Sequence, residues 1–72
     1  MIPELIFEVI QEADGGYLAE CLTESIVTEA DTWEQLRANV LEVVAAFYFD
    51  APEKRPRSIR LHLLRDEVLA CS

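Results

Sequence analysis

The chain has 72 residues, a length that suits one small domain, and it carries a formal net charge of −8. Residues 1–36 hold nine acids and no lysine or arginine, whereas residues 37–72 hold all six basic residues. Contacts to phosphates need a basic surface, so we expect no direct binding of nucleic acid. An acidic half favours a basic protein as partner, although the acids could equally serve only to keep the domain in solution.

The composition also bears on partners, compartment and cofactors. Hydrophobic residues make up 51% of the chain, which predicts apolar surface shared with another copy, as a dimer or higher homo-oligomer. Cys21 and Cys71 form no C-x-x-C pair, and the single histidine cannot complete a set of metal ligands with them. We therefore predict no metal and no cofactor. We expect reduced thiols in a cytoplasmic protein with no signal peptide, and no apolar run approaches the ~20 residues of a membrane span.

The first part of the chain predicts three antiparallel strands. Residues 5–10 are rich in β-branched and aromatic side chains, which is typical of a strand. Residues 13–16 read Ala-Asp-Gly-Gly, a sequence that supplies the positive φ angles of a tight hairpin turn. The return strand is expected at residues 17–22, and a third strand at residues 26–30 follows a polar break.

The periodicity then changes to that of a helix, which we expect at about residues 32–49. Thr32 is a suitable N-cap, Gln35 completes a capping box, and Glu34 places a negative charge in the first turn. One apolar stripe is predicted to face the core: Trp33, Leu36, Val40, Val43, Val44 and Phe47. Pro52 ends the helix, because proline cannot continue its hydrogen bonds.

After a polar loop at residues 50–57, alternation resumes at residues 58–65 and predicts a fourth strand; residues 66–72 are expected to fray. A helical crossover makes strands three and four parallel, so strand four can pair with strand one. The predicted fold is therefore α+β, a single domain over residues 1–72. Its order is β-β-β-α-β, with one four-stranded sheet in the order 3-2-1-4 and one helix on one face.

One helix covers only one face of this sheet. The set that suits the helix side is Phe7, Val9, Tyr17, Ala19, Cys21, Ile59, Leu61 and Leu63; the alternating set is Ile6, Glu8, Ile10, Leu18, Glu20, Leu22, Arg60, His62 and Leu64. The second set mixes charges with large aliphatic residues, as a partner-binding face does, or is a solvated face. Its members Glu8, Glu20, Leu22, Arg60, His62 and Leu64, with Leu41 and Phe49 on a spare flank of the helix, are the predicted partner-binding residues.

Nothing in the sequence forms a catalytic constellation, and we expect no enzyme activity. His62 stands mid-strand between leucines with no nucleophile nearby in sequence, so a surface or cross-strand histidine is favoured over a general base. Asp14, Glu20 and Asp31 could be imagined as metal ligands, but Asp14 and Asp31 suit turn and helix-capping roles better. The loop cations Lys54, Arg55 and Arg57 are expected to be solvated.

Two segments carry a resemblance to a known family. Residues 12–17, Glu-Ala-Asp-Gly-Gly-Tyr, and residues 30–36, Ala-Asp-Thr-Trp-Glu-Gln-Leu, resemble the hairpin turn and helix entry of the HicB-type antitoxin domain. The resemblance covers roughly residues 5–65 and implies a partial RNase H-like β-β-β-α-β unit. It also implies an oligomerising module that masks a small basic ribonuclease toxin of the HicA type.

The chain departs from that family in two places. Residues 22–26 lack the family's Pro/Gly-rich segment between strands two and three, which puts toxin binding in doubt if that loop contacts the toxin. No DNA-binding part follows, so operator binding is not expected. The alternative hypothesis is a stand-alone homo-oligomeric domain with a regulatory or small-molecule-binding role. A small hydrolase or nuclease is disfavoured.

Overall fold

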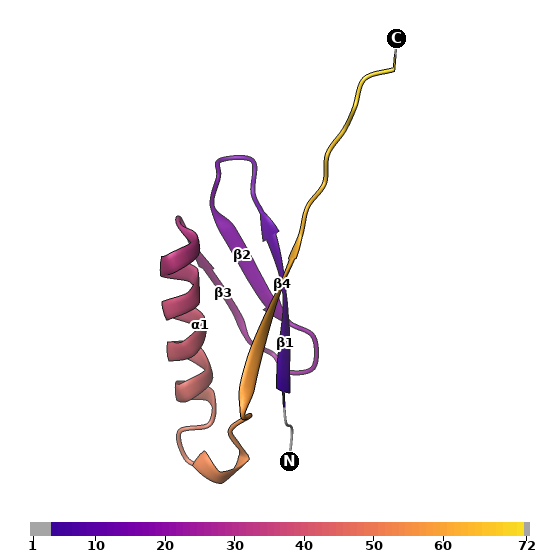
Figure 1. Cartoon of the computed structure of the whole chain (residues 1–72). Helices are drawn as coiled ribbons and strands as arrows, with labels where there is room; N and C mark the ends of the chain where they lie inside the picture. Colours follow the sequence, from indigo (N-terminus) through magenta and orange to yellow (C-terminus); the bar gives the residue numbers. More distant parts are fainter. Residues whose placement is uncertain (1–3, 72) are drawn as a thin grey trace.

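The computed structural model describes residues 4–71, which form four strands, one α-helix and one short 3₁₀ helix (Figure 1). In chain order these are β1 (Glu4–Gln11), β2 (Tyr17–Cys21), β3 (Val27–Ala30), α1 (Trp33–Phe47), η1 (Pro52–Lys54) and β4 (Ser58–Leu64). The predicted β-β-β-α-β order is confirmed, and η1 is an addition within the expected loop. No helix in the described part of the chain is long and apolar enough to cross a membrane.

The four strands form one mixed sheet in the order β3-β2-β1-β4, which confirms the predicted topology. Strand β1 pairs antiparallel with β2 and parallel with β4, and β2 pairs antiparallel with β3. Helix α1 packs along one face of the sheet, and residues 65–71 extend away beyond the end of β4 (Figure 1). The α+β class is therefore established, with one sheet face covered and the other open.

The turn between β1 and β2 forms because a glycine takes the conformation that other residues avoid. Gly15 has φ of +95°, in the left-handed region, and its N–H donates to the Glu12 carbonyl at 2.9 Å. The Asp14 side chain accepts a hydrogen bond from the Gly16 N–H at 3.0 Å. Asp14 therefore has the turn-forming role that the sequence predicted.

Helix α1 begins where the capping signal predicted. The Thr32 hydroxyl accepts a hydrogen bond from the Gln35 N–H at 3.1 Å, and Glu34 lies in the first turn. The helix ends at Phe47 rather than residue 49, with Tyr48 as its C-cap. Thr32, and not Asp31, is the capping residue.

The core lies between α1 and the sheet, and ten of its side chains are buried: Leu5, Phe7, Val9, Ala19, Cys21, Ile26, Leu36, Val40, Val44 and Tyr48. Two predicted core positions were wrong. Phe47 is 43% exposed, because the buried helix positions advance by four residues from Leu36 to Tyr48, which takes its place. Leu63 is 44% exposed, near the end of β4 from which the chain leaves the body of the domain (Figure 1).

Candidate protein-binding surface

The face of the sheet opposite α1 is the open face. The register places alternate residues there: Glu4, Ile6, Glu8 and Ile10 of β1, Leu18 and Glu20 of β2, Val27 and Glu29 of β3, and Ser58, Arg60, His62 and Leu64 of β4. The intervening residues Phe7, Val9 and Ala19 are fully buried against the helix. This settles which of the two alternating sets faces the helix, and the sequence alone left that question open.

Charged residues of the open face meet in one row across three strands. Glu8 lies directly opposite Glu20 of β2 on one side and directly beside His62 of β4 on the other. Val27 of β3 lies opposite Glu20 and extends the row with an apolar side chain that is 57% exposed. The register thus brings three of the predicted partner-binding residues, Glu8, Glu20 and His62, into one line.

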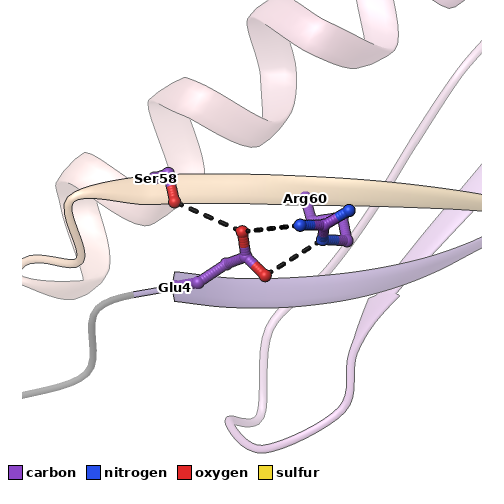
Figure 2. A network of polar contacts seen from close by, with 3 residues as sticks. All are labelled: Glu4, Ser58 and Arg60. Atoms are coloured by element: carbon purple, nitrogen blue, oxygen red, sulfur yellow. Dashed lines mark hydrogen bonds and ion pairs between the residues drawn. The ribbon is translucent and has the colours of Figure 1, made fainter.

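An ion pair on the same face joins the two parallel strands β1 and β4 (Figure 2). Arg60 Nε donates to Glu4 Oε1 at 3.0 Å, and Arg60 Nη2 donates to Glu4 Oε2 at 3.2 Å. The Ser58 hydroxyl also donates to Glu4 Oε2, at 3.4 Å. The hydrogen bond from Arg60 holds the pKa of Glu4 below its ordinary value, and Glu4 in turn raises the pKa of Arg60. Arg60 therefore already has a carboxylate partner in its own chain.

Apolar side chains flank the charged row on both sides. On one side Ile10 lies opposite Leu18 and beside Leu64, and these three form an apolar row across β2, β1 and β4. On the other side Ile6 pairs with Leu22, whose N–H donates to the Ile6 carbonyl at 3.0 Å directly after β2. Ile10, Leu22 and Leu64 are all exposed. The charged row therefore has an apolar row on one side and, on the other, a row in which Arg60 lies beside Ile6.

The two predicted helix residues lie away from the open face. Leu41 is exposed on α1 and lines a groove of about 310 Å³ between the helix and the start of β4; its other lining residues are Val44, Ala45, Arg55, Pro56, Arg57, Ser58 and Ile59. Phe49 follows the helix and is 82% exposed. The predicted partner-binding residues thus fall on three surfaces: the open face, this helix–β4 groove and the end of the helix.

The structure also contains an acidic cleft, which the sequence pattern did not predict as a site. Four acidic residues, Glu12, Asp14, Glu29 and Asp31, line a cleft of about 340 Å³ together with Gly16, Ala30, Gln35 and Asn39. Asn39 Nδ2 donates to the Glu29 carbonyl at 3.0 Å and so ties the helix to β3. No group in residues 4–71 has three potential metal ligands close enough to hold an ion. The acidic cleft adds negative charge beside β3, on the side of the sheet farthest from β4.

The chain is similar in sequence to a curated protein. It is 31% identical over 67 residues to the UPF0150 protein of Thermotoga maritima, an alignment that covers 93% of this chain and 91% of that protein. No family model matches the chain, and no solved structure matches it.

Proposed function

The chain belongs to the UPF0150 family, and we propose that it is a protein-binding module of the HicB-antitoxin kind. In this role its open face covers a small basic protein, a ribonuclease toxin of the HicA type. We assign no catalytic step to this chain. The two free thiols, one of them buried, suit a reducing compartment, and we place the protein in the cytoplasm.

The observation that carries this proposal is the juxtaposition of Glu8 and Glu20. They occupy directly opposed positions on two paired strands, where like charges destabilise a sheet. Both side chains are exposed, and apolar residues flank their row. A lysine or arginine from a partner would relieve this repulsion while its neighbours bury Ile10 and Leu22. The arrangement therefore costs folding stability in the free chain and favours a cationic partner.

The distribution of charge on the open face favours contact of a basic partner with some strands over others. The acids Glu8, Glu20 and Glu29 lie on β1, β2 and β3, and the acidic cleft continues beside β3. The cation Arg60 lies on β4, at the opposite side of the same face. A basic partner would therefore approach over β1–β3 and avoid β4. Opposite charges at such an interface accelerate association and fix its orientation.

The test is affinity capture of the full chain from its native host, with the bound proteins identified by mass spectrometry. We expect a small basic protein to be captured at low salt and released at high salt, since salt screens exposed charges. Glu8→Gln combined with Glu20→Gln removes the charge but keeps the shape of the row, and it should lose most of the partner. Glu53→Gln in η1, away from the face, is the matched control and should retain it. Capture that is equal for all three proteins would refute the proposal.

A further inference from the structure

The two edges of the sheet differ in how they are protected. Strand β3 has four residues, and the Glu29 carbonyl on it is already bound by Asn39 of α1. Strand β4 has seven residues and lies at the end of the sheet, so β1 pairs with one of its two edges and no strand within residues 4–71 pairs with the other. Long edge strands with apolar residues pair readily with another chain unless something covers them. The edge of β4 is therefore the part of the sheet that most requires a partner.

The segment that follows β4 has the properties of such a partner. Residues 65–71 extend away from the domain (Figure 1), with Val68 95% exposed and Leu69 76% exposed. The segment contains no glycine, proline or asparagine, the residues that would turn it back along its own strand. A tight two-residue hairpin that would cover the edge from which the segment emerges is therefore disfavoured. We call residues 65–71 the tail.

We propose that the tail of a second copy of this chain adds as an antiparallel strand along the free edge of β4, and that two copies exchange tails symmetrically. The two-fold axis passes beside Leu64, so that Leu64 meets Leu64 of the partner subunit. This inference concerns a different surface from the acidic side of the open face and does not depend on the identity of the basic partner.

The proposed register pairs tail residues with β4 residues on both faces. On the helix side, it places the partner subunit's Leu69 beside Ile59, at the helix–β4 groove lined by Leu41, Ala45 and Pro56. On the open face, it places the partner subunit's Asp66 beside His62. The apolar row of Leu18, Ile10 and Leu64 then continues across the axis into the same row of the second copy.

Charge also favours this occupant. Residues 54–64 carry four of the six basic residues of the chain and no acid, whereas the tail contains two acids, Asp66 and Glu67, and one base, Arg65. A basic edge in an acidic protein attracts an acidic strand, and the chain itself supplies one. Main-chain hydrogen bonds between β4 and the added strand provide affinity, and the leucine in the groove provides specificity.

The experiment compares two substitutions in the full chain, Leu69→Asp and Val68→Asp. In the proposed register Leu69 enters the groove, whereas Val68 lies on the open face beside Arg60 of the other copy, where an aspartate is tolerated. Both side chains are exposed within one copy, so neither change should disturb its fold, which circular dichroism would verify. Mass is measured by light scattering after size exclusion, and protection of β4 by hydrogen exchange.

We expect the wild type and Val68→Asp to have about twice the single-chain mass of 8.2 kDa at micromolar concentration. Leu69→Asp should raise the dimer Kd about a hundredfold, because each dimer buries two copies of Leu69 and each is expected to contribute about tenfold. It should also lose hydrogen-exchange protection over residues 59–69. A monomeric wild type, a Leu69→Asp dimer as tight as the wild type, or equal weakening by both substitutions would overturn the inference.

Discussion

The two faces of the sheet differ in burial and in charge. On the covered face, Phe7, Val9 and Ala19 are fully buried and carry no charge. On the open face, one residue along, Glu8 and Glu20 are exposed and oppose each other across the strands. Folding stability comes from the first set, and we expect the opposed like charges of the second set to cost some of it. The proposed binding of a basic partner would account for this difference between the two faces.

The largest expected effect is the difference in stability loss between a substitution on the covered face and one on the open face. Phe7→Ala leaves a cavity in the core and should cost about 3–5 kcal/mol of the free energy of unfolding. A domain of this size has about 4–10 kcal/mol in total, so much of the variant should be unfolded. Ile10→Ala, from the 44% exposed side chain on the other face, is the matched control and should cost well under half as much. Urea denaturation followed by circular dichroism measures both. Equal losses would mean that the open face is also part of a core.

The next effect has the opposite sign. Glu20→Gln removes one member of the opposed acidic pair and should raise the free energy of unfolding by about 0.2–1 kcal/mol. The same gain is expected from Glu8→Gln, and the double substitution should gain less than the sum, because the repulsion is removed only once. A double-mutant cycle in urea checks this expectation. Additive losses would show that the carboxylates stabilise the free chain and would remove the main support for the proposed function.

A third prediction concerns the covered side at alkaline pH. Burial, followed by the charges of Glu24 and Cys21, raises the pKa of Tyr48. The folded state therefore favours the neutral phenol, and this contribution is present below the ordinary pKa of tyrosine and is lost as pH rises through the raised value. Tyr48→Phe should make the alkaline loss of stability shallower than in the wild type. Thermal unfolding followed between neutral and alkaline pH tests this; identical profiles for wild type and Tyr48→Phe would contradict it.

The smallest effect belongs to the ion pair at the rim of the open face. The pKa of Glu4 is lowered by its hydrogen bond from Arg60, so its stabilising contribution is present above the ordinary glutamate pKa and is lost as pH falls through the lowered value. Glu4→Gln should therefore flatten the acidic side of the stability profile slightly, and added salt should reduce the difference because the pair is exposed. A salt-independent difference would indicate packing rather than charge.

Much of the fold followed from local signals in the sequence. The glycine at position 15, the Thr32 cap and the change of period at the helix are each readable within a few residues. Phe47 was misplaced because periodicity cannot decide between neighbouring positions at the last turn of a helix. Leu63 was misplaced because alternation shows which face a residue occupies but not how far the helix covers it.

The site depended on information that local patterns do not contain. The meeting of Glu8, Glu20 and His62 requires the register of three strands, and a slip of one residue would move each to the other face. The acidic cleft combines the β1–β2 turn with β3 and the first turns of α1. Its acids were visible as an excess in residues 1–36, but their convergence appears only when the strands pair.

The most direct test of the central claim is the salt dependence of binding between the captured basic partner and the full chain, measured by titration calorimetry for wild type and for the Glu8→Gln, Glu20→Gln double variant. If the open face binds through Glu8 and Glu20, the wild-type Kd should rise steeply with salt. The variant should bind more weakly with a shallower slope, although we expect it to be the more stable protein. Equal affinity and equal slopes for the two proteins would contradict the account.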